Sequence, residues 1–389
     1  MTRVAIIGNG IAGTTTAHWL HQSDPNIQIT LFEANDPLAA SFGQTLLVHP
    51  FPGRSLIPHE YLGDAVEQLQ IFLEFWRNRY PDLIRSCSMW RPMKGSNAQR
   101  LEQSWYDWWT PKGKHAQSNP WHSSPPNIYR LSDTDFFEHP SHKTPYETLS
   151  TDPAYMVDAG ELFPRIHRTW NHSTINVIQS TVQSLHADGS KWRIQTNSDD
   201  AISPFDQVVL AIGRHSKEWF PHLELTLQGG SLLRFKPQST SRIPALSLDG
   251  LHVGQHHSGD WVIGSTRWST PPTDINAETQ TLMNKLKQTL PQAPPMFEKN
   301  SSLWSGMRTI YPSDRMPLCG QLPQHRNVFV VTALGSKGWL WGPWASKCLT
   351  QRMQNPSHTI PTCIDLMRAN MEDGWYSPKI TSSRFGSLS

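Results

Sequence analysis

The sequence predicts an α/β fold, α+β overall, in which a discontinuous domain is interleaved with a second domain of mixed or antiparallel sheet. Continuous apolar runs at residues 4–7, 206–212 and 328–332 are typical of buried parallel strands. They lie at the start, in the middle and near the end of the chain, so one domain must be built from separate segments. The stretches between them contain short apolar segments typical of antiparallel strands, such as residues 251–253 and 261–263.

This order of segments sets the expected domain boundaries. We predict that the first domain comprises residues 1–86, 152–215 and 300–356, the second domain residues 87–151 and 216–299, and a C-terminal tail residues 357–389.

The first apolar run leads into a glycine-rich turn and a helix. Gly8, Gly10 and Gly13 have the spacing GxGxxG. Gly8 permits a tight turn, Gly10 lets the backbone approach a pyrophosphate, and Gly13 lets the helix pack on the strand. A pyrophosphate would meet the positive end of the helix dipole and the first N–H groups, which include those of Ile11 and Ala12.

Glu33 completes this signature. A second apolar run, residues 27–32, ends at Glu33, which lies 20 residues after Gly13. At this distance a carboxylate can accept hydrogen bonds from the ribose hydroxyls of an adenosine. An ordinary glycine-rich βα turn is the alternative, but strand, helix and acid together favour a dinucleotide site. The motif does not distinguish NAD from FAD.

The remaining elements follow from local patterns. The spacing of apolar residues predicts helices over residues 11–21, 61–79, 158–170 and 278–290, and strands over 175–180, 181–185, 191–196 and 232–235. Residues 87–151 are rich in Trp, His, Pro and Ser and predict only short strands and loops.

Two further strand ends predict contacts with the same ligand. Ala211 and Gly213 close the run at 206–212. After the run at 328–332, and before a helix that extends to about residue 352, the chain has Gly335, Ser336, Lys337 and Gly338. Ligands of open α/β sheets bind at the carboxyl ends of the strands. The N–H groups at the start of the last helix suit an electron-rich carbonyl, such as the C2 oxygen of a flavin. Each segment alone is also compatible with an ordinary βα turn.

The bulk properties exclude several classes of protein. The formal net charge of +2 gives no strong electrostatic case for a nucleic acid or a membrane surface. The four cysteines form no CxxC pair, which argues against structural zinc and fits a reducing compartment. The His256–His257 pair has no metal-ligand spacing and is interpreted as a solvated turn, so no metal is expected. An early first strand and short apolar runs predict a cytoplasmic protein without membrane insertion.

These motifs resemble the D-amino-acid-oxidase family of FAD-dependent oxidoreductases. The matching segments VAIIGNGIAGTTTAHWL, FDQVVLAIG, GGSLLRFKP, WVIGST and residues 304–349 follow one another in family order. The last is the most specific, because it has the family pattern G-x-R, P-x-D, P-x-x-G and G-x-x-x-G. The resemblance implies a Rossmann-like FAD-binding domain, an interleaved substrate domain, and non-covalent FAD, since Gly306 and Met307, not a cysteine, flank Arg308.

The resemblance also assigns roles to residues outside the glycine turn. Arg308 matches the arginine that grips the substrate carboxylate, for which a guanidinium fork is suited; a surface ion pair is the alternative. Asp314 is expected to be a turn residue. His49 and Trp339 are weaker candidates for the substrate side. The further FAD contacts that the resemblance implies are Ala40, Ser41, Val182 and Gly306.

The implied reaction is oxidation of the C–N bond of an amino acid or N-substituted glycine, with hydride transfer to flavin N5. The LGSKG segment and the loop from Ala40 to Pro50 are most similar to the flavin domain of the tRNA 5-methylaminomethyl-2-thiouridine biosynthesis enzyme, and glycine oxidase is also similar. A carboxymethylaminomethyl-uridine in tRNA is therefore an alternative to a small amino-acid or amine substrate. Phe42 and Gly43 depart from that loop, so a non-catalytic flavoprotein subunit is an alternative of another class. The electron acceptor and the oligomeric state stay open.

Overall fold

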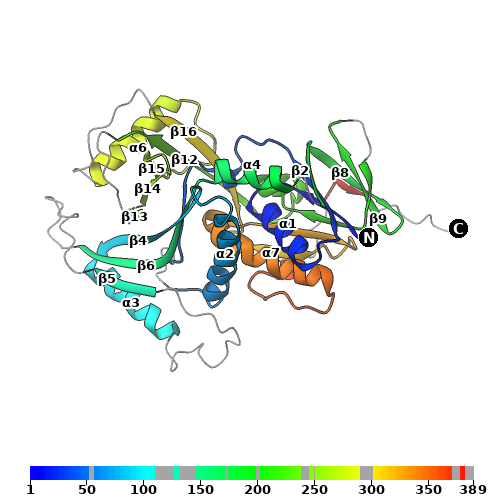
Figure 1. Cartoon of the computed structure of the whole chain (residues 1–389), viewed down its shortest axis with the longest axis horizontal. Coiled ribbons are helices and arrows are strands. Elements are labelled where there is room, and N and C mark those ends of the chain that lie inside the picture. Colours follow the sequence, from blue (N-terminus) through cyan, green and yellow to red (C-terminus); the bar gives the residue numbers. More distant parts are fainter. Residues whose placement is uncertain are drawn as a thin grey trace. The chain divides into compact units, whose positions relative to one another are not determined.

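The computed structural model of the chain is shown in Figure 1. It describes residues 1–51, 57–109, 127–131, 146–170, 174–198, 202–237, 245–248, 250–289, 301–369 and 377–381. The chain divides into two compact units. Unit 1 comprises residues 1–42, 163–228 and 306–389, and unit 2 comprises residues 43–162 and 229–305.

Unit 1 contains a six-stranded sheet in the order β17-β18-β11-β1-β2-β7. Its first, middle and late strands are β1 (Arg3–Ile7), β11 (Gln207–Leu210) and β18 (Val328–Thr332). They are parallel neighbours, as the three apolar runs predict, and their side chains are almost entirely buried. The remaining strands are β2 (Gln28–Glu33) and β7 (Ile175–Gln179), both parallel, and the antiparallel β17 (Leu318–Gln321).

Two helices of unit 1 pack against each other beside this sheet. These are α1 (Ile11–Ser23) and α7 (Gly338–Gln354), which lie side by side in Figure 1. Residues 11–20 of α1 are all buried. Polar atoms join the helices as well, because Trp19 Nε1 donates to the Pro343 carbonyl at 2.8 Å and Thr15 Oγ1 to Ser346 Oγ at 2.8 Å.

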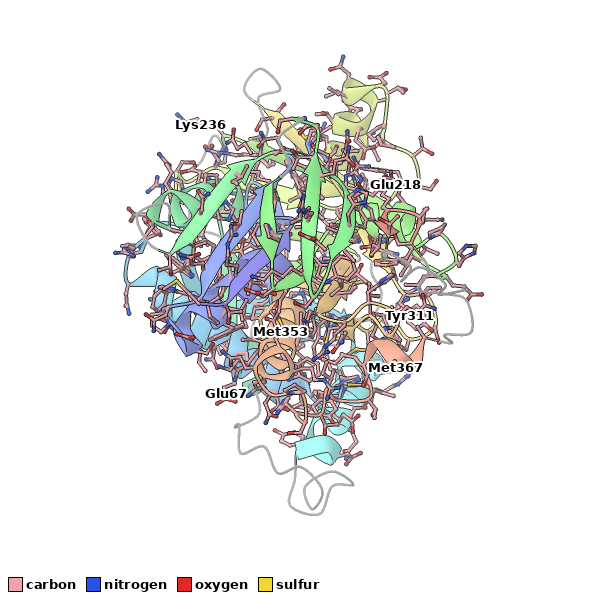
Figure 2. All side chains as sticks on the ribbon, turned by 90° about the vertical axis from the view of Figure 1, so that its right-hand side faces the viewer. Glu67, Glu218, Lys236, Tyr311, Met353 and Met367 are labelled. Carbon is pink, nitrogen blue, oxygen red and sulfur yellow. The ribbon has the colours of Figure 1, made fainter. Side chains whose placement is uncertain are left out.

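A second sheet of unit 1 includes the end of the chain. Its order is β10 (Ile202–Phe205), β9 (Lys191–Thr196), β8 (Val182–Asp188) and β19 (Ile380–Thr381). Ile380 is buried, and Lys379 forms an ion pair with Glu218, which is labelled in Figure 2, on α5 (Ser216–Trp219). The described part of the tail therefore belongs to unit 1.

A nine-stranded sheet organises unit 2, and two of its strands continue into unit 1 with residues 226–228 and 306–310. Its order is β16 (Ser302–Ile310), β12 (Thr226–Phe235), β15 (Trp261–Gly264), β14 (Leu251–Gln255), β13 (Ala245–Leu248), β4 (Ile84–Lys94), β6 (Tyr146–Val157) and β3 (Leu46–Val48), and β5 (Asn127–Leu131) also pairs with β6. The pairs are antiparallel apart from β13 with β4, among those whose register is known. The helices are α2 (Leu62–Arg77), α3 (Gly95–Trp109) and α6 (Ile275–Thr289).

The expectation of short strands and loops over residues 87–151 is wrong where this region is described. It contains most of the 11-residue strand β4, the 15-residue helix α3, and part of the 12-residue strand β6. Ala98, Leu101 and Trp105 are buried at helical spacing within α3. The polar residues between them concealed this pattern, and the long pairing of β4 with β6 is a tertiary effect.

The compact units differ from the predicted domain boundaries. Residues 43–86 belong to unit 2, because β3 pairs with β6 and α2 packs against β4. The tail belongs to unit 1 through the pairing of β19 with β8. Within the described ranges, no helix is both long and apolar enough to span a bilayer.

Candidate functional site

The glycine turn after β1 is tightly constrained. Gly8 has a φ of +103°, and a Cβ atom there would lie 2.3 Å from the Ala211 carbonyl oxygen. A Cβ atom on Gly13 would lie 1.8 Å from the Gly8 carbonyl oxygen, so α1 can approach β1 only with glycine there. The first is the tight turn and the second the close helix packing that the sequence motif predicts for these two glycines.

The first turn of α1 presents donors for an anion. Gly10 is its N-cap residue and supplies no side-chain acceptor. The N–H of Ile11 donates to Ser41 Oγ at 2.9 Å, so this predicted phosphate donor already has a partner. Ala12 and Gly13 occupy the next positions, where an α-helix provides no acceptor for the N–H group. These two N–H groups are therefore the available donors, and Ser41 on η1 (Ala40–Phe42) fixes the turn beside them.

Glu33 lies at the carboxyl end of β2. Burial raises the pKa of its carboxyl group, and the neighbouring Asn9 side chain opposes that rise. No basic side chain of the described residues forms an ion pair with it. A half-buried carboxylate without a cation suits hydroxyl donors, so the turn, the helix start and Glu33 fit the adenosine and pyrophosphate parts of FAD.

A buried histidine that the sequence analysis missed supports the glycine turn. Thr14 Oγ1 donates to the Asn9 carbonyl at 2.9 Å, and His167 Nε2 lies 3.1 Å from the same hydroxyl. Because the hydroxyl proton is used, His167 must donate through Nε2. Its ring stacks between Phe163 and Trp170 on α4 (Ala159–Trp170). The sequence could have indicated the burial of His167, because His167 lies at helical spacing between Phe163 and Trp170 on the apolar face of α4.

His167 makes the stability of the fold depend on pH. Burial lowers the pKa of His167 from 6.5 to about 4. As the pH falls below 6.5, His167 becomes protonated in the unfolded chain, whereas in the folded protein it stays neutral down to about pH 4. The free energy of unfolding therefore decreases across this window, and His167 contributes about 2 kcal/mol of the decrease by pH 5.

Glutamine in place of His167 keeps a hydrogen-bond donor but does not titrate. The free energy of unfolding of His167→Gln should therefore fall by about 2 kcal/mol less than that of wild type between pH 7 and pH 5. Urea unfolding of the FAD-bound protein at pH 7 and pH 5 measures it, with exposed His222→Gln as the matched control. An equal loss of stability in wild type and His167→Gln would show that His167 is not the titrating group.

The other predicted cofactor residues lie on unit 1 at the ends of neighbouring strands. Gly213 follows β11 with a φ of +53°, and its carbonyl accepts from Thr309 Oγ1 at 2.7 Å. Gly335, Ser336 and Lys337 form η5 (Gly335–Lys337) between β18 and α7. Because β1, β11 and β18 are parallel neighbours, their carboxyl ends share one edge of the sheet. Val182 instead packs its side chain into the core, in a cluster with Ile7 and Phe32.

Arg308 lies on β16 near the loop that holds Ser41. Met307 N–H donates to the Leu38 carbonyl at 2.8 Å, and Gly306 precedes it. Arg308 Nη2 donates to Gln228 Oε1 at 3.1 Å. Asp314 is a turn residue, as expected, since its Oδ1 accepts from Met316 N–H at 2.9 Å and its Oδ2 pairs with Arg368 at 2.6 Å.

The two weaker candidates lie in different units. Trp339, at the start of α7, stacks on Phe163 with ring centroids 5.0 Å apart, and Phe42 meets Phe163 edge-on at 5.4 Å. The Trp339 indole N–H is buried without a hydrogen-bond partner among the described residues. His49 belongs to unit 2, where its ring lies 6.1 Å from that of His252. These contacts favour packing for His49.

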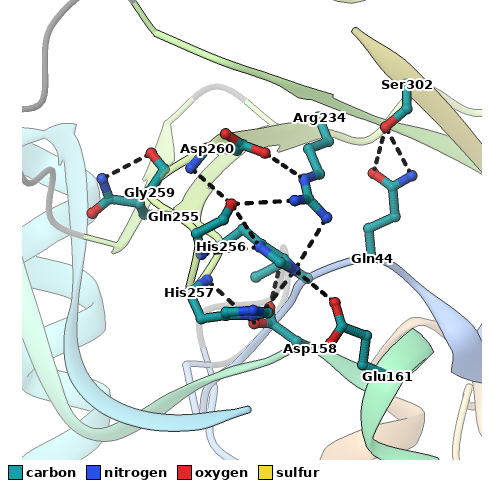
Figure 3. A network of polar contacts seen from close by, with 12 residues as sticks. Gln44, Asp158, Glu161, Arg234, Gln255, His256, His257, Gly259, Asp260 and Ser302 are labelled. Carbon is teal, nitrogen blue, oxygen red and sulfur yellow. Dashed lines mark hydrogen bonds and ion pairs between the residues drawn. The ribbon is translucent and has the colours of Figure 1, made fainter. Parts of the chain in front are cut away.

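The prediction of a solvated turn at His256–His257 is confirmed for the turn and for the exposed His257, but it is wrong for His256, which is buried. The His256 side chain is 2% exposed, and the His257 side chain is 30% exposed. Figure 3 shows both rings directed toward Asp158, and His257 Nδ1 lies 2.6 Å from Asp158 Oδ2. Adjacent histidines gave no spacing signal, because their partner Asp158 is about a hundred residues away in the sequence.

Comparisons with known proteins agree with this geometry. A family model described as FAD dependent oxidoreductase, DAO, matches residues 3–352. Iminodiacetate oxidase from Chelativorans sp. BNC1 is similar in structure, with a TM-score of 0.73 and 16% identity over 94% of this chain and 98% of that one. Glycine oxidase from Geobacillus kaustophilus has a TM-score of 0.71 and 15% identity over 95% of this chain and 98% of that one. L-amino acid deaminase from Proteus vulgaris has a TM-score of 0.75 and 12% identity over 95% of this chain and 97% of that one. At these identities the structures show the fold.

Proposed function

The chain belongs to the DAO family of FAD-dependent oxidoreductases, and from that premise we propose that it oxidises the C–N bond of an amino acid or N-substituted glycine. The observation that carries the proposal is the placement of Arg308. It lies on unit 1, on a strand whose Met307 bonds the loop before Ala40 and Ser41, and so on the same compact unit as the glycine turn and Glu33. A carboxylate held by this arginine would therefore be anchored from the cofactor-binding unit itself.

The residues of the chain have three tasks in this reaction. Ala12, Gly13 and Glu33 would hold the pyrophosphate and ribose of FAD. Bound FAD would supply the acceptor for the hydride that leaves the substrate carbon next to nitrogen. Arg308, oriented by Gln228, would grip the substrate carboxylate through two hydrogen bonds and fix the adjacent carbon. The names of iminodiacetate oxidase and glycine oxidase, two proteins of similar fold, fit a small substrate that carries both an amine and a carboxylate.

Anaerobic reduction of the bound flavin tests the proposal. The panel is glycine, sarcosine, iminodiacetate, D- and L-amino acids, the same amines without a carboxylate, and bulk tRNA, with products identified by mass spectrometry. Reduction by carboxylate-bearing amines alone supports the proposal. Reduction by tRNA alone would select the carboxymethylaminomethyl-uridine alternative, and bleaching by none of them would favour a non-catalytic flavoprotein.

The flavin should be held without a covalent bond. Gly306 and Met307 precede Arg308 and Thr309 follows it, and Cys319 is fully buried in β17, where burial raises the pKa of its thiol well above the ordinary value. A buried neutral thiol is a poor nucleophile. Acid precipitation should therefore leave all of the FAD in the supernatant, measured by its absorbance. Yellow colour retained by the washed precipitate would contradict this.

A further inference from the structure

Three potential metal ligands, Asp158, His256 and His257, converge at the β14–β15 turn and the start of α4 within unit 2, and Glu161 lies beside His256 (Figure 3). His256 Nε2 lies 3.6 Å from Asp158 Oδ2 and 3.7 Å from Glu161 Oε1. His257 Nδ1 lies 2.6 Å from the same Asp158 oxygen. Neighbouring ligand atoms of a tetrahedral zinc ion are about 3.3 Å apart, so small side-chain movements would place the atoms of Asp158, His256 and His257 at bonding distance, and a larger movement of Glu161 would complete the set.

The surrounding hydrogen bonds orient these groups as the outer shell of a metal site does. Thr45 Oγ1 donates to Asp158 Oδ1 at 2.5 Å, which leaves Oδ2 directed at the two histidines. Arg234 Nη1, which can only donate, lies 3.2 Å from His256 Nε2, and the Ser258 N–H lies 3.2 Å from Nδ1, so each ring nitrogen faces a donor. With a cation on Nε2, the ring proton would lie on Nδ1, 2.9 Å from Ser258 Oγ, in place of the bond that Nδ1 accepts from the Ser258 N–H at 3.2 Å. A hydrogen bond from the second ring nitrogen is the usual way to fix a ligating histidine.

Exposure and charge also suit a cation. The Asp158 and His256 side chains are 1% and 2% exposed, whereas those of His257 and Glu161 are 30% and 44% exposed. Two ligands are thus fixed in the interior, and two lie at an opening and can adjust. The carboxylates of Asp158 and Glu161 together balance a charge of +2, which lowers the cost of placing a divalent ion there.

Arg234 is the competitor for this position. Its Nη1 lies 3.2 Å from His256 Nε2, but the guanidinium is also held by Asp260 through Nε at 2.8 Å and by Ser258 through Nη2 at 3.2 Å. A cation would displace only the first of these three bonds. It would also replace the proton between His257 Nδ1 and Asp158, and neutral His257 would then carry its proton on the more exposed side of the ring.

We propose that Asp158, Glu161, His256 and His257 form a binding site for one divalent cation of the zinc class, in competition with Arg234. The two imidazoles and two carboxylates are ligands that Zn²⁺ accepts in a four-coordinate site. The site is independent of the flavin chemistry and departs from the expectation of no metal.

Binding of Zn²⁺ to the tag-free, FAD-loaded protein after dialysis against a chelator tests this, by calorimetry and by competition with a chromophoric chelator. One equivalent should bind, and Co²⁺ should give the intense visible bands of a tetrahedral complex. His257→Ala and Glu161→Gln should each weaken binding at least tenfold. Arg234→Met should tighten it, because the competing donor is removed. His222→Ala, at an exposed histidine outside the cluster, should change nothing.

Three results would overturn the proposal. One is the absence of stoichiometric binding by both wild type and Arg234→Met. The second is unchanged affinity in His257→Ala, and the third is unchanged affinity in Arg234→Met, since His256 Nε2 would then not be a ligand. The FAD spectrum and the melting temperature report that each variant is folded, and Asp158 is left intact because it also bonds Thr45.

Discussion

Glu33→Ala should weaken FAD binding by about 1.5–3 kcal/mol, or roughly 10- to 150-fold in Kd, without a change of fold. The carboxylate stands at the end of β2 and is half-buried, and burial raises its pKa. Burying a charged carboxylate costs free energy, and the hydroxyl groups of a ribose would offset this cost by donating hydrogen bonds to it. Removing the carboxylate leaves those donors without their charged partner.

The measurement is a titration of apoprotein with FAD, followed by flavin fluorescence. Glu33→Gln keeps an oxygen acceptor but loses the charge, so its loss of affinity should be smaller than that of alanine. Glu224→Ala, at an exposed acid of the same unit, is the matched control. If Glu33→Ala binds FAD as tightly as wild type, Glu33 is not the ribose ligand and the dinucleotide interpretation of the motif loses its acidic partner.

The sequence predicted the elements whose patterns are local. β9 and β18 have the predicted bounds, and α4 begins within one residue of its predicted start. Continuous apolar runs identify parallel strands because both faces of a parallel sheet are covered, so every residue of such a strand is buried and apolar. The glycine turn was predicted because its spacing is local, and Gly8 and Gly13 are each required by a close backbone approach, whereas Gly10 faces the Ser41 side chain.

The features that the sequence did not predict depend on residues far apart in the chain. β4 and β6 support each other across their ladder, although their composition resembles that of loops. The bond of Ser41 to the N–H of Ile11 uses a residue 30 positions away, and that of His167 to Thr14 spans 153 positions. The buried His256 lies 3.6 Å from Asp158, which is about a hundred positions earlier in the chain. Patterns within one segment cannot record such partners.

Arg308→Ala should lower catalytic efficiency toward the true substrate by about 2–4 kcal/mol, or roughly 30- to 1,000-fold. A bidentate ion pair both attracts the carboxylate and fixes the adjacent carbon, so alanine should raise KM and also slow flavin reduction. Arg308→Lys keeps the charge but loses the planar fork, and should raise KM with a smaller loss of rate.

Gln228 offers a graded version of the same test. Its Oε1 accepts from Arg308 Nη2 at 3.1 Å. Gln228→Leu should therefore keep the charge of Arg308 but remove the hydrogen bond that orients its guanidinium. The expected loss is smaller than that of Arg308→Ala, about tenfold, and appears mainly in KM. Arg193→Ala, which removes an exposed arginine that pairs with Asp188, is the control.

The FAD spectrum separates the two roles that Arg308 can have. An arginine that contacts only the substrate leaves the visible spectrum and the Kd for FAD unchanged when it is replaced. Anaerobic stopped-flow reduction then isolates the substrate step from reoxidation. If Arg308→Ala reduces its flavin as fast as wild type with the true substrate, Arg308 is a structural residue that bonds Gln228. The substrate would then be an amine without a carboxylate, because nothing else in the proposed clamp supplies a guanidinium fork.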